Sequence, residues 1–198
     1  MASFGDPGAT VPVGLRHERF VLRPIRTDDA ADDFAALMET RELLRRWEQS
    51  EWPADDFTVE ANREDLAGLQ QRHDEHRAYT FTVRDPEDTV CLGCVYLFPT
   101  TARFLAKSTV TPVDTEAWKD VDAVAYFWVR LSQLEAGLDR ALLGALRAWL
   151  RDDWGFERVV FVTNEQFEQQ VGLLTGTDLT LRFELREPGK AGTYLAFG

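Results

Sequence analysis

The sequence is poor in the residue types that bind metals and form disulfides. It has two cysteines and three histidines among 198 residues. Cys91 and Cys94 form a single C-x-x-C pair, whereas a structural zinc site needs a second pair of ligands. Their stretch, "TVCLGCVYLF", is typical of a strand, in which positions three apart face opposite sides. We therefore expect two small buried thiols in a reducing cytoplasm, and no metal site.

Long apolar runs and an excess of positive charge are also missing. No stretch approaches the roughly 18 to 20 apolar residues of a membrane span, and residues 1–14 lack the basic and apolar parts of a signal peptide. Thirty-four acidic against 22 basic residues give a net charge of −12. This argues against nucleic-acid and membrane partners and is compatible with an amine-bearing one, although such acidity mostly serves solubility. We expect a cytoplasmic protein; a homodimer is compatible with the sequence, which leaves the oligomeric state open.

The apolar content, 44 %, is enough for the core of one domain. Residues 1–14, rich in Gly and Pro, predict a flexible arm, and residues 15–198 a single domain. In the first half we predict a strand over 18–25, a helix over 27–48 with Thr27 as its N-cap, a helix from Thr58 to about Arg77, and a hairpin over 78–99 around "DPED". His73 and His76 lie in the polar second helix, where we expect them to be solvated.

In the second half, residues 100–120 are irregular. Strands are predicted over 121–130 and 157–164, a helix follows each of them, and a hairpin over about 179–197 closes the chain. This order predicts an α/β (α+β) fold: a mixed, mostly antiparallel sheet of about six or seven strands, flanked by helices. The crossover from Val121 to Asn164 should be a right-handed parallel unit. Ligands bind at the carboxyl ends of such strands, beside a helix N-terminus, so a site is expected at residues 128–141.

The stretch "LSQLEAGLDRALLGALRAWL" (131–150) raises a question at this position. A strand runs into a glycine turn and an amphipathic helix, an arrangement that seats phosphates. However, the turn and the helix start contain Glu135 and Asp139, which are both anionic. Either Arg130 and Arg140 offset these acids and a phosphate still binds, or the carboxylates cap the helix N-terminus themselves.

Element order and motifs resemble the GNAT superfamily of acyl-CoA-dependent N-acetyltransferases. "FVLRPIRTDDAADDFAALM" resembles the opening strand and helix of that family, "AYFWVRLSQLEAGLDRALLGAL" its central strand, pyrophosphate loop and following helix, and "FERVVFVTN" the next strand. The "YFWV" strand is similar to the branch that acetylates protein N-termini. The resemblance implies a GNAT-like sheet with a splayed central parallel pair, and acetyl-CoA as co-substrate.

In the family, Arg/Gln-x-x-Gly-x-Gly/Ala lets backbone N–H groups wrap the CoA pyrophosphate. Here Gly137 keeps the first glycine, but Asp139 takes the second small position and Leu134 the leading one. Val171 stands where many members have a tyrosine that protonates the leaving thiolate, and the strand before Asn164 lacks the glutamate base of some members. The resemblance implies these CoA-binding residues: Trp128, Val129, Arg130, Gly137, Leu138, Asp139, Arg140 and Asn164.

Two main functions stay open from the sequence, beside a third, a catalyst that uses a different acyl donor or a non-CoA ligand. The first is an N-acetyltransferase that moves acetyl from acetyl-CoA to a primary amine of a small molecule or a protein N-terminus. Its base is not identified; Tyr126 is the catalytic candidate, beside the acids Asp114, Glu116, Asp120 and Asp122, while Trp47 and Trp52 could line the acceptor cleft. The alternative is a catalytically degenerate GNAT-fold module for binding or regulation, with weak or no CoA binding.

Overall fold

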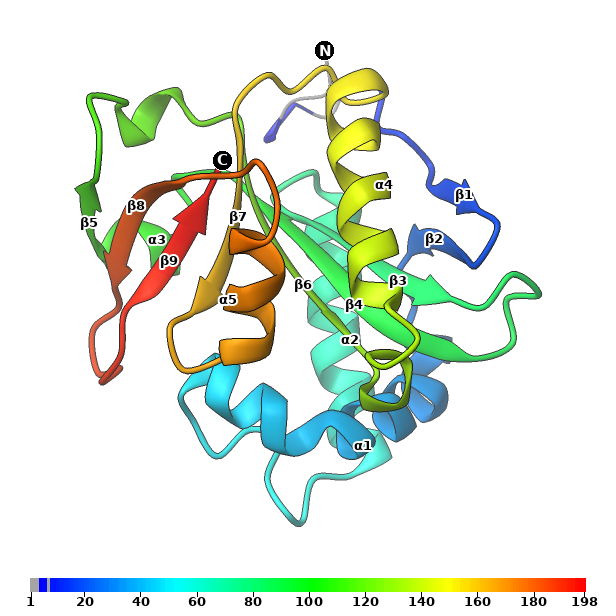
Figure 1. Cartoon of the computed structure of the whole chain (residues 1–198). Helices are drawn as coiled ribbons and strands as arrows, with labels where there is room; N and C mark the ends of the chain where they lie inside the picture. Colours follow the sequence, from blue (N-terminus) through cyan, green and yellow to red (C-terminus); the bar gives the residue numbers. More distant parts are fainter. Residues whose placement is uncertain (1–3, 7) are drawn as a thin grey trace.

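The computed structural model describes residues 4–6 and 8–198, and in these one nine-stranded sheet forms the centre of the molecule (Figure 1). The strand order is β1-β2-β3-β4-β6-β7-β9-β8-β5, and every neighbouring pair is antiparallel except β6 and β7. The mixed sheet is therefore confirmed. Two strands beyond the expected six or seven are short edge strands, β1 and β5. The bounds are β1 Leu15–His17, β2 Phe20–Pro24, β3 Tyr79–Arg84, β4 Cys91–Phe98, β5 Thr109–Pro112, β6 Ala123–Val129, β7 Val159–Asn164, β8 Leu181–Arg186 and β9 Tyr194–Phe197.

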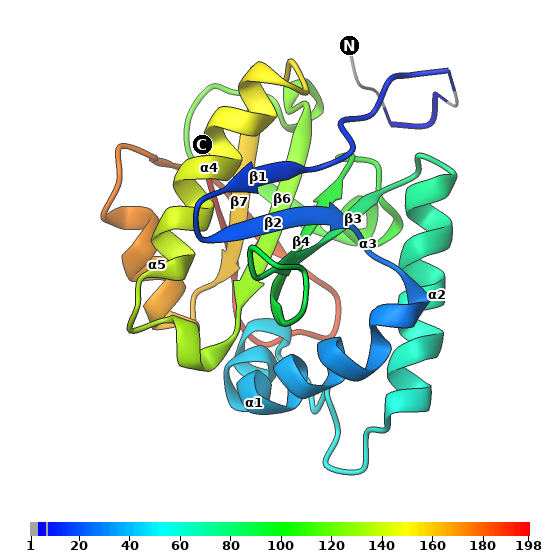
Figure 2. The same cartoon turned by 90° about the vertical axis from the view of Figure 1, so that its right-hand side faces the viewer.

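Helices cover both faces of the sheet. The long helices α1 (Ala30–Glu48) and α2 (Val59–Asp74) pack on one face, and α4 (Leu138–Asp152) and α5 (Glu168–Thr175) on the other (Figure 2). The stretch 100–120, which we expected to be irregular, contains the short helix α3 (Arg103–Lys107) and strand β5. Each face of the sheet has its own apolar core, because alternate residues of β6 point to opposite sides.

Of the two N-cap residues that the sequence suggested, only one caps its helix. Thr58 caps α2 as predicted, since its hydroxyl accepts a hydrogen bond from the Ala61 N–H at 3.1 Å. Thr27 does not cap α1: it begins a short 3-10 turn, Thr27–Asp29, and Asp29 is the N-cap position of α1. The Asp29 carboxylate binds the Arg23 guanidinium on β2 instead, at 2.7 Å. The start of α1 is therefore held to the sheet by the Arg23–Asp29 ion pair and has no side-chain cap.

The two cysteines lie on the same face of the sheet, so the expectation of opposite faces was wrong. Val83 pairs with Gly93 and Arg84 pairs with Cys91, which leaves Leu92 as an extra residue in a β-bulge. The extra residue shifts the alternation by one, and both Cys91 and Cys94 enter the core under α1. Both are free and buried, as expected.

His73 is buried, contrary to the solvated position we expected. Its Nδ1 lies 3.0 Å from the Thr80 carbonyl, and its ring packs edge-on against Tyr79 and Phe81. Burial lowers the pKa of this imidazole. Across residues 4–6 and 8–198, no group of three or more His, Cys, Asp or Glu could hold a metal ion. None of the helices within these residues is long and apolar enough to cross a membrane.

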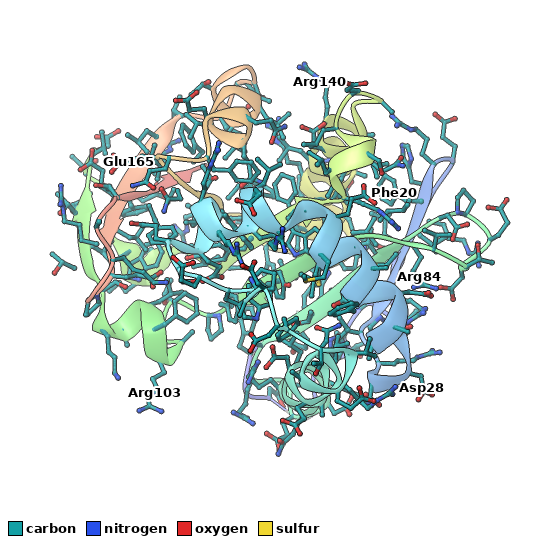
Figure 3. All side chains as sticks on the ribbon, turned by 90° about the horizontal axis from the view of Figure 1, so that it is seen from below. Phe20, Asp28, Arg84, Arg103, Arg140 and Glu165 are labelled. Carbon is teal, nitrogen blue, oxygen red and sulfur yellow. The ribbon has the colours of Figure 1, made fainter. Side chains whose placement is uncertain are left out.

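The parallel pair diverges toward its carboxyl ends, as the resemblance implied. β6 and β7 pair only over Ala123–Ala125 and Val159–Phe161, although β6 continues to Val129 and β7 to Asn164. Helix α1 crosses the end of the sheet where the strands separate, as the view from below shows (Figure 3). The division into an arm (1–14) and a domain (15–198) stays a prediction; Met1, Ala2, Ser3 and Pro7 lie outside the described residues.

Candidate active site

The gap between the diverging strands is the predicted donor site, and backbone groups of β6 face it. The Arg130 N–H donates to the Leu92 carbonyl at 2.7 Å, so this pair is a hydrogen-bonded pair of the β4–β6 ladder. Hydrogen-bonded and non-bonded pairs alternate in an antiparallel ladder. The backbone N–H and C=O groups of Phe127 and Val129 therefore face away from β4, toward the gap. Val129 is one of the residues that the resemblance implies for CoA binding.

A side chain from α5 already occupies part of this gap. The Gln170 amide is almost fully buried, and its Nε2 donates to the Phe127 carbonyl at 2.8 Å. Its Oε1 has no partner among the described residues. The glutamine therefore takes one acceptor of the open strand edge and presents an unpaired acceptor of its own. The sequence pattern predicts no polar group of α5 in this gap.

Hydrogen bonds connect the loop after β6 to helix α1. The Glu39 carboxylate accepts the Ser132 N–H at 2.9 Å and the Arg130 guanidinium at 2.5 Å, and the Thr40 hydroxyl accepts the Leu131 N–H at 3.0 Å. These contacts lower the pKa of Glu39, against a burial effect in the other direction. Arg130 is therefore paired with α1, and two loop N–H groups already have an anionic or hydroxyl partner.

Asp139 answers the question that its sequence position raised. Its side chain is buried; Oδ1 accepts the Arg140 N–H at 2.8 Å, and Oδ2 accepts the side-chain amide of Gln169 from α5. Glu135, in contrast, is exposed. One carboxylate therefore satisfies an N–H of the first turn of α4 and bridges the starts of α4 and α5.

The other residues implied by the resemblance are spread around this site. Gly137 is left-handed (φ 66°) and precedes α4, while Leu138 is core and Arg140 is exposed. Trp128 points under α1 and donates to the Tyr96 hydroxyl at 3.2 Å. Asn164 is buried and donates to the Trp47 carbonyl at 3.4 Å.

The fit to a CoA pyrophosphate is therefore mixed. The glycine turn and the helix N-terminus fit an anion, and the Arg19 guanidinium, 2.9 Å from the Ala136 carbonyl, adds positive charge beside the turn. The Asp139 carboxylate opposes an anion. The turn keeps its shape, but its electrostatic fit depends on one side chain.

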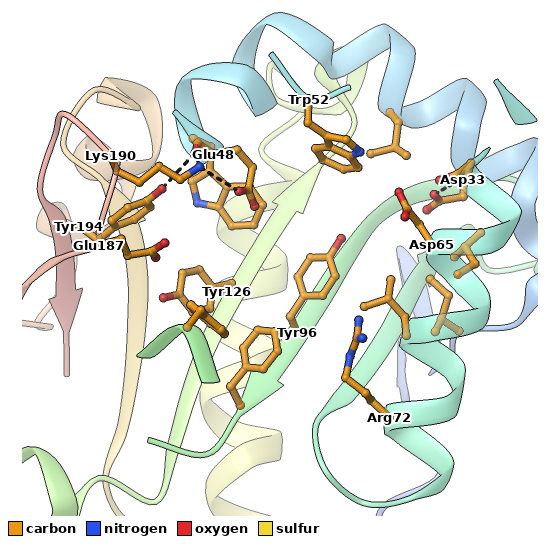
Figure 4. Close-up of a pocket in the computed structure, with 18 residues that line it drawn as sticks. Asp33, Glu48, Trp52, Asp65, Arg72, Tyr96, Tyr126, Glu187, Lys190 and Tyr194 are labelled. Carbon is orange, nitrogen blue, oxygen red and sulfur yellow. Dashed lines mark hydrogen bonds and ion pairs between the residues drawn. The ribbon is translucent and has the colours of Figure 1, made fainter. Parts of the chain in front are cut away.

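On the α1 and α2 face, a cavity of about 460 Å³ lies next to the end of the parallel pair (Figure 4). Seven of its 18 lining residues are aromatic, and Tyr126, Trp47 and Trp52 are among them. Tyr126 was the catalytic candidate and the two tryptophans were candidates for the acceptor cleft, so the structure brings these three together. None of the implied CoA-binding residues lines this cavity.

Two polar atoms in the cavity wall lack partners. Tyr126 and Trp47 are 6 % and 5 % exposed, yet the Tyr126 hydroxyl and Trp47 Nε1 have no hydrogen-bond partner in residues 4–6 and 8–198. Burying a polar group without a partner costs about 1–3 kcal/mol. Such groups in a cavity wall are typical of a site that a ligand completes.

Charged residues cluster at two ends of the cavity (Figure 4). Glu48, Glu187 and Lys190 lie at the end formed by the β8–β9 hairpin, which we call the hairpin end. Burial raises the pKa of both glutamates, and the charge of Glu48 raises that of Glu187 further. Lys190 lies 3.9 Å from the Glu48 carboxylate.

The opposite end, which we call the α2 end, contains Asp33, Asp65 and Arg72. Asp33 is nearly inaccessible, and its Oδ2 accepts from Asn62 Nδ2 at 2.9 Å. Burial raises the pKa of Asp33 to about 6, although the bond from Asn62 acts against it. Burial also raises the pKa of Asp65.

The acids of the 114–122 loop lie elsewhere. Asp122 accepts the N–H groups of Glu157 and Arg158 at 2.9 and 2.8 Å, so it holds the start of β7. Asp114 and Glu116 lie about 4 Å from the Arg182 guanidinium (4.0 and 3.9 Å). None of the four acids lines the cavity, and as candidates for the base they are not supported.

The sequence reasoning missed most of the charged cavity residues. Glu48, Glu187 and Lys190 come from the end of α1 and from a turn some 140 residues later, so only the tertiary fold brings them together. Asp33 had a local signal: it is an acid on the buried side of an amphipathic helix, where a carboxylate needs a partner.

Replacing Asp33 by asparagine should make the protein more stable near neutral pH. The raised pKa means that the folded state binds the proton more tightly than the unfolded chain, so the contribution of Asp33 to stability is lost as pH rises from about 4 to about 6. Two pKa units correspond to at most about 3 kcal/mol. The new side-chain amide would still accept the bond from Asn62. The free energy of unfolding, measured with urea, should therefore fall less between pH 5 and pH 7 for the variant than for the wild type. Equal losses would contradict the prediction.

Comparison with known proteins gives one curated relative and many similar structures. No family model matches the chain. The probable N-acetyltransferase YjcK of Bacillus subtilis (strain 168) is 25 % identical over 144 residues, which cover 67 % of this chain and 78 % of that protein. The ribosomal-protein-S5-alanine acetyltransferase of Vibrio fischeri superposes with a TM-score of 0.67 at 17 % identity, covering 94 % of this chain and 95 % of its own.

The acetyltransferase MccE, which provides microcin C7 self-immunity and was solved with acetyl-CoA and AMP, gives a TM-score of 0.68 at 12 % identity, covering 94 % of this chain and 96 % of its own. At such identities a structural match concerns the fold alone. The splayed β6–β7 pair, the strand order and these matches agree with one another. The resemblance seen in the sequence is confirmed: the chain has the fold of the GNAT superfamily of acetyltransferases.

Proposed function

We propose that the protein is a GNAT-type N-acetyltransferase that transfers acetyl from acetyl-CoA to a primary amine. The observation that carries the proposal is the acid-lined aromatic cavity, whose wall includes Tyr126 of β6, three residues before Val129 on the same strand. Acetyl-CoA, as co-substrate, supplies the activated thioester. An amine in the cavity can attack the thioester carbon; the C–N bond forms, the C–S bond breaks, and CoA leaves as the thiol.

The residues of this chain have three tasks in that reaction. The Val129 N–H polarises the thioester carbonyl, as a preorganised backbone donor does. Glu48 and Glu187 hold the ammonium form of the acceptor at the hairpin end, and the unpartnered Tyr126 hydroxyl faces these acids. Because burial raises the pKa of each glutamate, either carboxylate is a stronger base than an exposed one and can take a proton from the amine.

A second candidate function is an amine-binding module that does not use CoA. The bridge from Asp139 to Gln169, together with the Gln170 contact to the Phe127 carbonyl, favours it. Asp139 also accepts the Arg140 N–H that a phosphate would use, and Gln170 fills part of the gap between the strands.

Two measurements distinguish the candidates. Calorimetry with acetyl-CoA should give saturable binding, and a thiol-release assay with a panel of amines should show turnover that depends on both substrates. If acetyl-CoA does not bind to the folded protein while amines do, the acetyltransferase proposal is wrong and the binding module is supported.

A further inference from the structure

The cavity has an uncompensated negative charge at each end. The hairpin end has two carboxylates, Glu48 and Glu187, and one cation, Lys190. The α2 end, likewise, has Asp33, Asp65 and Arg72. Among the lining residues, each end therefore has one acid more than it has cations. Figure 4 shows the two groups on opposite sides of the cavity, with the rings of Tyr96 and Tyr126 between them.

The two charged ends are far apart. Asp33 lies in the first turn of α1 and Glu48 is its last residue, which places them on the order of 20 Å apart along a straight helix axis. Their side chains, and those of Asp65 and Glu187, reduce the span that a ligand must bridge. A compact monoamine can therefore contact only one end.

The wall between the ends is apolar and aromatic. The apolar and aromatic lining residues include Leu37, Leu66, Leu69, Tyr96, Phe98, Phe104 and Tyr126. Such a wall suits a methylene chain, whereas the amide groups of a peptide backbone would lose hydrogen bonds to water there. Aromatic faces also attract ammonium groups.

We propose that this cavity binds a linear organic dication, a diamine or polyamine, with one ammonium at the Glu48–Glu187 end and the other at the Asp33–Asp65 end. The inference rests on the proposed function in one respect only, which is that the bound amine is also the acetyl acceptor. The reacting amine lies at the hairpin end, because this end is next to the end of β7. Tyr194 of β9 pairs with Asn164, the last residue of β7, and its hydroxyl donates to the Glu48 carbonyl at 3.3 Å.

The first test compares ligands by calorimetry without acetyl-CoA. Diaminooctane and diaminodecane should bind about tenfold more tightly than octylamine, because they gain a second charge-assisted contact. Diaminobutane is too short to reach both ends and should gain nothing over butylamine. Aminooctanoate, with a carboxylate at the far end, should bind more weakly than octylamine.

The second test uses variants of one end at a time. Asp65→Asn should lower the affinity for diaminooctane to that for octylamine and leave octylamine unchanged, whereas Glu187→Gln should weaken both ligands. The amide introduced at position 65 would still accept the hydrogen bond that Trp52 gives to the carboxylate. Glu60→Gln, an exposed position on the same helix as Asp65 and outside the cavity, is the matched control and should change nothing. Circular dichroism and urea unfolding check that each variant is folded.

Equal affinities for octylamine and diaminooctane, or no affinity for either, would overturn the proposal. So would a basic tripeptide that binds more tightly than any diamine. If diamines bind with the expected length dependence but are not acetylated, the dication site stands and the acetyltransferase proposal fails. If other amines are acetylated and diamines show no advantage, the acetyltransferase proposal stands and the dication proposal fails.

Discussion

Replacing Gly93 by alanine is expected to destabilise the protein by about 3 kcal/mol or more. A Cβ atom at this position would lie 2.2 Å from the Trp128 carbonyl oxygen and 2.9 Å from the Val129 Cα. Both are backbone atoms of the central strand β6, so neither can rotate away. Gly93 also has φ +155°, a backbone conformation that residues with a side chain rarely adopt.

The same change should impair the site. Gly93 pairs with Val129 across β4 and β6, so any relief of the clash moves the strand end that faces the donor gap. We expect acetyl-CoA affinity and turnover to fall even at temperatures where the variant is folded. Urea unfolding measures the stability and calorimetry measures the binding.

Gly144→Ala is the matched control for this prediction. Gly144 is exposed in the interior of α4, where an added Cβ would have no heavy atom within 4 Å, and alanine favours a helix by up to about 1 kcal/mol. The control should be slightly stabilised. If Gly93→Ala unfolds at the same urea concentration as the wild type, the close approach of β4 and β6 is absent.

The sequence predicted the order of the main elements because that order depends on local patterns, whereas the divergence of the parallel pair was implied by the resemblance to the GNAT superfamily. Continuous apolar runs rich in β-branched and aromatic residues mark β6 and β7, and the amphipathic stretch after Gly137 marks α4. The β-bulge at Leu92 could not be predicted. It depends on the register between β3 and β4, which is a tertiary property, and it reversed the expected side of Cys91.

The acceptor side of the site was less predictable than the donor side for a similar reason. The donor loop is contiguous in the chain, so Gly137 and Asp139 could be placed from their spacing alone. The cavity combines residues of α1, α2, β4, β6 and the β8–β9 hairpin. Trp47 and Trp52 were found because they lie near the expected cleft, whereas Glu187 had no signal within its own segment.

The partner of Asp139 was also outside the reach of the sequence. The pattern showed a carboxylate where a small residue is expected, but not that Gln169 donates to it from α5. This contact changes the expectation for the loop: the acid is held in place between two helix starts, and it is not free to turn away from an incoming phosphate.

Asp139→Gly should therefore tighten CoA binding by roughly an order of magnitude. A carboxylate about 5 Å from a phosphate costs roughly 3 kcal/mol at an effective dielectric of about 20, and solvent and salt reduce this to about 1–2 kcal/mol. Each 1.4 kcal/mol is about tenfold in affinity. The variant should also lose some stability, since α4 loses its first-turn acid and gains a glycine. Calorimetry with CoA at low and high salt measures the effect, which should shrink as salt is added.

Two further variants distinguish the effect of the Asp139 charge from the effect of the hydrogen bond that Gln169 of α5 donates to it. Asp139→Asn removes the charge and keeps an oxygen for the Arg140 N–H, so it should reproduce most of the gain with less loss of stability. Gln169→Ala breaks the bridge and leaves the carboxylate, so it should give little gain, with no dependence on salt. Equal gains from Gln169→Ala and Asp139→Asn would mean that the bridge, and not the charge, hinders CoA. If none of the three variants binds CoA while all remain folded, the Asp139 charge is not what excludes CoA, and the acetyltransferase proposal is wrong.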